Sequence, residues 1–423
     1  MSMTISAPPS SAGSRFPGTE YVRARAEKLL YWAVACWIFS GGIILFEPSF
    51  YELLFIPTLL IAAIAGMRFY RSTASLLFLT IIFFPFALIA SFQAFYTPLT
   101  QAFIFALVTF FLLLTSVFTA NYVAAAPHER VKGIMIAYTV ITVISALIGL
   151  YGYLRHVDTF TLYGRAKAMF KDPNVYGPFL ILPAIFALER ILMSRSLKRI
   201  IVSGVVYCIL LVGVFASFSR AAWGVFAFAS LATFLMVFFL EANGRDKVRM
   251  LLMGLVGGAF LLVALGGLIS LPAFNSLFEE RASVTQNYDT GSSGRFGRQG
   301  YAFDLALQNP LGLGPLEFQH LENKEQPHDT YVTVLHHYGW GGGIAYYALV
   351  ILTLIRGFAG LRYKRVRLLL IPLLAVYVPH VVEAAIIDID HWRHYFLIVG
   401  LIWGVTTFNI RDQKPLSREE ALV

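Results

Sequence analysis

The stretch LTQAFIFALVTFFLLLTSVFTA, residues 99–120, decides the fold class of this chain. It contains no Asp, Glu, Lys or Arg, and a helix of about 20 apolar residues is long enough to cross the roughly 30 Å hydrocarbon core of a bilayer. Similar runs recur along nearly all of the 423 residues, of which 58% are hydrophobic and only 13% are charged. Soluble domains usually carry about 25% charged residues, so the composition excludes a water-soluble globule. The sequence predicts an all-α, polytopic membrane protein.

The apolar runs predict about twelve transmembrane helices. The predicted spans are residues 29–46, 51–67, 75–94, 99–120, 133–154, 176–193, 200–217, 221–240, 251–273, 330–355, 366–387 and 393–409. The predicted organisation is therefore a disordered cytoplasmic tail (1–28), helices 1–9 (29–273), a long extracytoplasmic loop between helices 9 and 10 (274–329), helices 10–12 (330–409) and a cytoplasmic tail (410–423). Such a loop, much longer than about 15 residues, usually has a function.

The positions of Lys and Arg predict the orientation. They collect in every second short loop, and short cytoplasmic loops are the ones that retain basic residues, so both termini are predicted to be cytoplasmic. The net charge of +9 follows mostly from this pattern and from attraction to anionic membrane lipids. Nucleic acid is therefore not a predicted partner. Cys36 and Cys208 lie inside spans and imply no disulfide.

Several basic residues break this pattern because they lie on the opposite, extracytoplasmic face. They are Arg165, Lys167 and Lys171 after the fifth span, Arg220 between the seventh and eighth, and Arg295 and Arg298 in the long loop. An anionic ligand on that face is the simplest explanation, since guanidinium and ammonium groups bind phosphate oxygens well. Contact with lipid headgroups is the alternative for the loop residues, and snorkelling to the interface is the alternative for Arg220.

Residues 288–315, YDTGSSGRFGRQGYAFDLALQNPLGLGP, contain glycines on both sides of a predicted helix. A glycine-rich turn that opens a helix presents free amides to an anion, and Arg295 and Arg298 share one helix face. Asn309-Pro310 ends this helix, and Gly312 and Gly314 form the next turn. The spacing is not that of a P-loop or of a dinucleotide-binding motif.

His328 lies in QPHDTYVTVLHHYGWGGG, residues 326–343, where the polar loop meets the tenth span. The adjacent carboxylate of Asp329 is predicted to orient the imidazole and raise its basicity, which suits a general base. A structural role is the alternative, as for most single histidines. A zinc site is not predicted, because the histidines lack a cysteine partner and metal-ligand spacing.

The last extracytoplasmic turn, IIDIDHWRHY at residues 386–395, concentrates ionisable residues. Asp388 and Asp390 are of the residue type that binds a divalent cation in metal-dependent glycosyl transfer. A short polar turn between two spans is the interpretation that we favour for this stretch.

Four motifs together resemble the bacterial O-antigen ligase and O-antigen polymerase superfamily of integral membrane glycosyltransferases, over roughly residues 130–405. The family shows Gly-Arg before a Pro-Leu-x-Gly-x-Gly turn; here Gly294-Arg295 precedes Pro310-Leu311-Gly312-Leu313-Gly314. The family's histidine-led segment HNxYLxxLxExGxxG is matched by His328, Tyr331, Leu335, Gly339 and Gly342. Arg220 matches an arginine after a Ser-rich span end, and residues 172–174 match a DPN motif. Asp329, His337 and Gln299 depart from the family's asparagine, glutamate and aromatic residue.

The resemblance implies transfer of a glycan from undecaprenyl diphosphate to an acceptor hydroxyl, on the periplasmic face of the inner membrane and without a metal or cofactor. In a ligase the acceptor is the lipid A core. His328, Arg220 and Arg295 are then the expected catalytic residues. The expected substrate-binding residues are Arg165, Lys167, Lys171, Asn174, Arg298, Asp329 and Tyr331.

Two alternatives remain at this point. An O-antigen or exopolysaccharide polymerase would use the same donor with a glycan acceptor, and the shared motifs do not separate it from a ligase. A polysaccharide transporter or flippase also often has about twelve helices, but it predicts two related halves and short loops.

Overall fold

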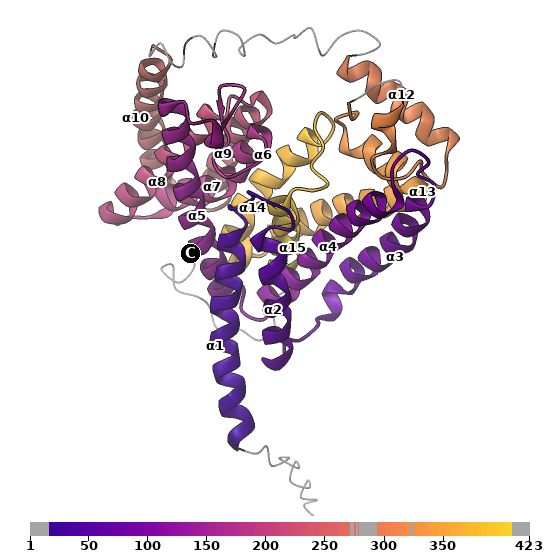
Figure 1. Cartoon of the computed structure of the whole chain (residues 1–423). Coiled ribbons are helices and arrows are strands. Elements are labelled where there is room, and N and C mark those ends of the chain that lie inside the picture. The colour runs from indigo at the N-terminus through magenta and orange to yellow at the C-terminus, as the bar shows by residue number, and fades with distance from the viewer. Residues whose placement is uncertain (1–16, 271–274, 276–277, 279–293, 322–324, 408–423) are drawn as a thin grey trace, which may run out of the picture.

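The computed structural model describes residues 17–270, 275, 278, 294–321 and 325–407, and helices account for most of them (Figure 1). The α-helices are α1 (Pro17–Ser40), α2 (Phe50–Ile64), α3 (Ala74–Ser91), α4 (Leu99–Ala124), α5 (Pro127–Arg155), α6 (Pro173–Phe179), α7 (Ile181–Met193), α8 (Leu197–Ala216), α9 (Arg220–Leu240), α10 (Gly244–Ile269), α12 (Arg295–Gln308), α13 (Thr330–Gly360), α14 (Lys364–Glu383) and α15 (Arg393–Val405). Three 3₁₀ turns are η1 (Arg71–Thr73), η2 (Asp158–Phe160) and η3 (Glu317–His320). The strands β1 (Thr161–Leu162) and β2 (Arg165–Ala166) pair antiparallel, with Thr161 opposite Ala166.

The helices confirm an all-α, multi-pass membrane protein. In the described part of the chain, nine helical segments are long and apolar enough to cross a membrane. They are α3 with η1, α4, α5, α6 with α7, α8, α9, α10, α13 and α14. Each predicted span coincides with a helix, but α2 and α15 are shorter apolar helices and α1 is not among the nine. The number twelve therefore remains a prediction.

The N-terminal boundary of the first helix differs from the prediction. Helix α1 begins at Pro17, so residues 17–28 are helical and do not belong to a disordered tail. Ala, Arg, Glu and Lys make up more than half of this stretch, and all are strong helix formers. The rest of the predicted tail, the C-terminal tail from residue 410 and most of the loop before Gly294 lie outside the described residues.

The segments that connect the helices lie at two ends of the helix bundle, and polar contacts join segments at the same end. At one end, named here the site end, Lys171 pairs with Glu47 at 2.9 Å and the amide of Thr330 donates to the carbonyl of Ala384 at 2.7 Å. The site end comprises residues 41–49, 92–98, 156–172, 217–219, 309–321, 325–329 and 384–392. At the other end, named the basic end, Arg195 pairs with Asp246. This grouping agrees with the alternation of loops predicted from the sequence.

Helix α15 lies at the centre of the bundle, and every residue from His394 to Val405 is buried. A helix that is apolar on all sides is expected in such a position. Gly400 and Gly404 face α4 so closely that a Cβ atom on either would lie within 2.8 Å of an α4 backbone carbonyl. Small residues four apart allow such close approach between membrane helices. The same contact holds the segment before α15, residues 384–392, against the site end of α4.

Helix α13 is broken at Gly339, where the backbone is non-helical with φ of 70°. The turn after α12 pairs with this break: the amide of Leu313 donates to His336 O at 2.7 Å, and the amide of Trp340 donates to Pro310 O at 2.9 Å. A Cβ on Gly339 would lie 2.5 Å from Pro310 O. The glycines of the turn and of the helix thus let two backbones meet without intervening side chains.

Substituting Gly339 with alanine should destabilise the protein. The Gly339 backbone, with φ of 70° and ψ of −177°, is in a region that is almost restricted to glycine and costs other residues about 1–3 kcal/mol. The overlap of a Cβ with Pro310 O adds to this cost. We expect a clear fall in the melting temperature of the detergent-solubilised protein. Gly204→Ala in α8 is the matched control, because a Cβ there meets nothing within 4 Å. An equal melting temperature for both variants would refute this account of the break.

Candidate functional site

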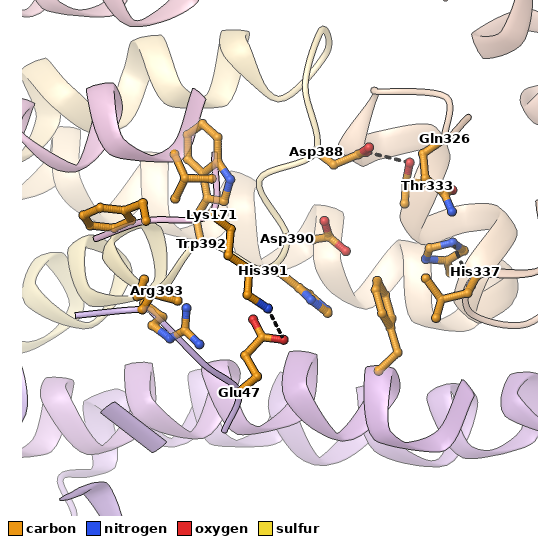
Figure 2. A pocket seen from close by; sticks show the side chains of 15 residues that line it. Glu47, Lys171, Gln326, Thr333, His337, Asp388, Asp390, His391, Trp392 and Arg393 are labelled. Carbon is orange, nitrogen blue, oxygen red and sulfur yellow. Dashed lines mark hydrogen bonds and ion pairs between the residues drawn. The ribbon is translucent and has the colours of Figure 1, made fainter. Parts of the chain in front are cut away.

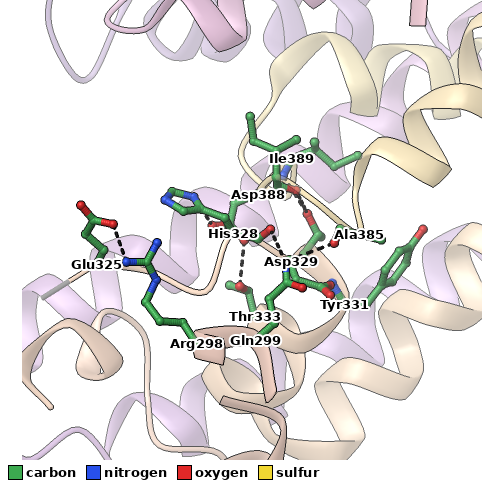
Figure 3. A network of polar contacts seen from close by, with 12 residues as sticks. Arg298, Gln299, Glu325, His328, Asp329, Tyr331, Thr333, Ala385, Asp388 and Ile389 are labelled. Carbon is green, nitrogen blue, oxygen red and sulfur yellow. Dashed lines mark hydrogen bonds and ion pairs between the residues drawn. The ribbon is translucent and has the colours of Figure 1, made fainter. Parts of the chain in front are cut away.

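His328 precedes α13 at the site end, and contacts with Gln299 and Asp388 define its position (Figure 3). Its backbone has φ of 56°, a left-handed conformation that non-glycine residues rarely adopt and that is often found at functional sites. The side-chain amide of Gln299 on α12 donates to His328 O at 3.1 Å and to Ala385 O at 3.3 Å. The imidazole Nδ1 lies 3.5 Å from Asp388 Oδ2, and the ring is partly exposed.

The carboxylate beside the His328 ring is therefore that of Asp388, and the prediction that Asp329 orients the ring was wrong. Asp329 is the N-cap of α13, and its Oδ1 accepts from the amides of Tyr331 at 2.9 Å and Val332 at 3.2 Å. The residue before a helix faces the free amides of the first turn, which a carboxylate satisfies well. Burial nevertheless raises the pKa of Asp329, against the effect of these amide donors.

Asp388 also joins the imidazole to a cavity of about 300 Å³. Thr333 Oγ1 donates to Asp388 Oδ1 at 2.8 Å, while Oδ2 faces His328. Figure 2 shows Asp388, Asp390, Gln326 and His337 around this cavity, with Lys171 and Glu47 on another side. The turn that the sequence analysis interpreted as a simple polar connection thus lines a cavity next to the candidate base. The density of ionisable residues in the turn was a signal for such a role.

Burial dominates the electrostatics of this turn. It raises the pKa of Asp390 to about 8, and the charge of Asp388 acts in the same direction. Burial also lowers the pKa of His391 to about 4, so both side chains are uncharged at neutral pH. Nε2 of His391 lies 2.7 Å from Thr109 Oγ1 on α4, and the His391 ring lies against that of Phe105.

Arg165 and Asn174 come together in a second polar group at the site end. Arg165 is buried on β2, where its Nε donates to Ser217 O at 2.8 Å and its Nη2 donates to Asn174 Oδ1 at 2.7 Å. Asp172 is the N-cap of α6, and its side chain accepts from the Asn174 amide at 2.7 Å. Arg165 thereby ties the loop after α5 to the turn before Arg220, the first residue of α9.

The two predicted lysines differ in their surroundings. Lys167 Nζ donates to the carbonyls of Thr159 at 2.9 Å and Phe170 at 3.2 Å, so it stabilises its own loop. Lys171 lines the cavity and pairs with Glu47.

Arg295 begins α12 as Arg220 begins α9, but the two helices lie on opposite sides of the site end (Figure 1). Arg220 and Arg295 were expected to form one group. In this arrangement their helices, α9 and α12, lie apart, so contact between the two helices does not bring the arginines together. Arg295 lies one helical turn before Gln299, whose side chain holds the His328 backbone. Arg220 follows the turn at residues 217–219, whose Ser217 carbonyl accepts from Arg165. The site thus has two sides. Gln326 lies on the side that carries His328, Lys171 lies on the second side, and both residues line the cavity.

Arg298 and Tyr331 have structural partners. Arg298 is 8% exposed and pairs with Glu325 at 2.6 Å. The Tyr331 hydroxyl donates to Val381 O at 2.6 Å, which ties α13 to α14. Their predicted contacts with substrate remain predictions.

The described residues contain no group of three or more His, Cys, Asp or Glu side chains placed to hold a metal ion. The two carboxylates of the 386–395 stretch face a histidine and a cavity, as described above.

These observations define a class: a multi-pass helical membrane protein with a polar site at one end of its bundle. Residues 205–347 match the family model described as O-antigen ligase, so this part of the chain is similar to that family. The matched segment contains Arg220, Arg295 and His328. No curated protein matches the sequence. The family implies a glycosyltransferase-like ligase or polymerase activity.

Replacing Asp390 with asparagine should stabilise the protein, and more so at high pH. An unfolded chain ionises aspartate near pH 4, whereas burial holds the pKa of Asp390 at about 8 in the fold. Raising the pH from about 4 to 8 therefore removes stability from the natural protein but not from the asparagine variant. We expect the gain in melting temperature to be larger at pH 9 than at pH 5. Asp158→Asn on exposed η2 serves as the control, and a gain that shrinks with pH would contradict the burial argument.

Proposed function

We propose that this protein is an O-antigen ligase-like glycosyltransferase. It moves a glycan from undecaprenyl diphosphate to a hydroxyl of an acceptor, the lipid A core, without a metal and with inversion at the anomeric carbon. The family match over residues 205–347 supports the reaction class. The observation that carries the proposal is the His328–Asp388 pair beside a cavity that Asp388 also lines.

The histidine is arranged as a general base. With Nδ1 facing the Asp388 carboxylate, the neutral ring carries its proton there and leaves Nε2 to accept a proton from the acceptor hydroxyl. A contact of 3.5 Å is long for a hydrogen bond, and such contacts commonly shorten when substrate binds. Gln299 fixes the backbone of His328, so the ring is held by α12 as well as by the segment before α15.

The arginines would stabilise the leaving diphosphate. As the anomeric C–O bond breaks, negative charge grows on the diphosphate, and preorganised cations lower the energy of that state. Arg220 and Arg295 are each the first residue of a helix, so each guanidinium lies at the positive end of a helix dipole. Because α9 and α12 lie apart, the two would approach a bound diphosphate from opposite sides of the site end.

The same arrangement suits the bacterial inner membrane. The basic end would face the cytoplasm together with both termini, by the distribution of Lys and Arg. The site end would face the periplasm, where a lipid-linked donor and an acceptor sugar can meet at the membrane surface. The polyprenyl chain would lie along the apolar helix surfaces below.

Reconstitution tests the activity. Proteoliposomes would be supplied with one undecaprenyl-diphosphate-linked glycan and either lipid A core or a second glycan as acceptor. A new bond to lipid A core is the expected product, a longer glycan would identify a polymerase, and substrate movement without a new glycosidic bond would refute enzymatic transfer.

Removing the candidate base should nearly abolish transfer. General base catalysis contributes about 10²- to 10⁴-fold to rate, so His328→Ala should lower turnover by that factor while the protein still inserts. Turnover in proteoliposomes is the measurement. His320→Ala on η3 is the matched control, since His320 is exposed and does not line the cavity. Wild-type turnover in the His328 variant would reject the proposed role.

Removing either arginine should weaken use of the donor. Hydrogen bonds to charged groups contribute about 1.5–3 kcal/mol, so Arg220→Ala and Arg295→Ala should each raise the donor KM about ten- to hundredfold or lower kcat correspondingly. Donor titrations at saturating acceptor measure both. The control Arg199→Ala removes an exposed arginine near the basic end. Donor curves that superimpose on those of the natural protein would contradict the diphosphate role.

A further inference from the structure

The cavity beside Asp388 contains buried polar atoms whose hydrogen-bonding capacity is unused. Within the described part of the chain, no hydrogen bond satisfies Asp390 Oδ2, His337 Nδ1 or either amide atom of the Gln326 side chain. All three residues line the cavity, and Asp390 and His337 are only 3% and 1% exposed. A buried polar group without a partner costs about 1–3 kcal/mol. Several such groups around one space indicate a ligand that satisfies them.

The walls of the cavity restrict the kind of ligand. Phe105, Trp392 and the His391 ring supply flat apolar surface, while Gln326, Thr333 and Asp390 supply donors and acceptors. A pocket with aromatic walls and a few placed polar groups suits a small molecule that is polar at its edges. The volume, about 300 Å³, is at the lower end of the range for such pockets. A pyranose ring has this combination of hydroxyl edges and apolar faces.

The charges in the cavity indicate that the ligand is uncharged. Its two cations are already paired: Lys171 with Glu47 at 2.9 Å, and Arg393 Nε with Glu52 Oε1 at 2.7 Å. Asp388 and Asp390 have no Lys or Arg ion pair in the described part of the chain. A phosphate or carboxylate group on the ligand would meet these carboxyl groups without a free cation to balance it. Burial raises the pKa of Asp390 to about 8, so at neutral pH it can both donate to and accept from hydroxyl groups.

We propose that this cavity is the acceptor subsite and that it binds the uncharged terminal sugar of the acceptor. This inference rests on the proposed glycosyl transfer and adds the acceptor class to it. The sugar would lie against Trp392 and Phe105 with one hydroxyl directed past Asp388 to His328. That hydroxyl gives its proton to His328 Nε2, its oxygen forms the new bond to the anomeric carbon of the donor, and the diphosphate leaves with the electron pair of the broken C–O bond.

Direct binding tests the subsite without the transfer reaction. Saturation-transfer NMR on the purified full chain would use the methyl glycosides of glucose, galactose, mannose and N-acetylglucosamine, together with glucose 6-phosphate and mannose 6-phosphate. We expect at least one neutral glycoside to bind saturably. We expect the 6-phosphate of a sugar that binds to be at least about tenfold weaker, because it brings negative charge close to the Asp388 carboxylate. Failure of all four glycosides to bind, or equal binding of the phosphate ester, would overturn the proposal.

A matched pair of variants places the binding in this cavity. Gln326→Leu replaces the side-chain amide with an apolar group of nearly the same size. It should weaken glycoside binding about three- to tenfold, the effect of one neutral hydrogen bond. Gln319→Leu makes the same change on η3, outside the cavity, and should leave binding unchanged. Equal affinities in the two variants would show that the sugar binds elsewhere.

Kinetics separate this inference from the proposed function. If transfer occurs, Gln326→Leu should raise the acceptor KM and leave the donor KM unchanged, and an unchanged acceptor KM would overturn the subsite while the transferase assignment stands. If the natural protein binds neutral glycosides in an amide-dependent way but transfers nothing, the transferase assignment fails and sugar binding in the cavity is upheld.

Discussion

The geometry of the site depends on one constraint, that a helix inside a membrane cannot leave backbone groups unpaired. The helical hydrogen bonds of α13 are interrupted at Gly339. The turn at residues 310–314 replaces them, because the amide of Leu313 and the carbonyl of Pro310 pair with α13 backbone groups. In hydrocarbon each unpaired amide or carbonyl would cost several kcal/mol. The break therefore fixes the end of α12 against α13. Since Gln299 on α12 holds His328, the position of the candidate base follows from how that break is satisfied.

The opposite wall of the site depends on close packing between α4 and α15. Gly400 and Gly404 bring the two backbones together, and Ser116 Oγ donates to Phe396 O at 2.8 Å across the same contact. Small residues and interhelical hydrogen bonds are the usual means of holding membrane helices together. This packing fixes the position along α4 of the turn before α15, which carries Asp388 and Asp390. The two carboxyl groups and the imidazole thus come from segments far apart in the sequence, and each is placed by helix contacts below it.

The sequence was sufficient to predict the features of the fold that depend on local sequence pattern. Long apolar runs located the helices, and glycines correctly indicated a turn at residues 310–314. What it missed depends on contacts between distant segments. Adjacency suggested that Asp329 orients His328, yet the free amides of α13 bind that carboxylate and Asp388 takes the place beside the ring. Nothing in the 386–395 stretch alone reveals that α4 and α13 complete a cavity around it. The start of α1 was missed because its charged, helix-forming residues resemble a polar tail.

The charges at the site are distributed unevenly between the cavity and its surroundings. Cations that begin α9 and α12 lie on its two sides, whereas the cavity between them has its own cations neutralised and retains carboxyl groups. An enzyme that handles an anionic donor and a hydroxyl acceptor must keep the donor's phosphates out of the acceptor position, and like charge achieves this without steric exclusion. Asp388 is common to both requirements, because it lines the cavity and its Oδ2 lies 3.5 Å from the imidazole Nδ1. Under the proposed function, a single carboxylate would repel the wrong substrate and orient the base that activates the right one.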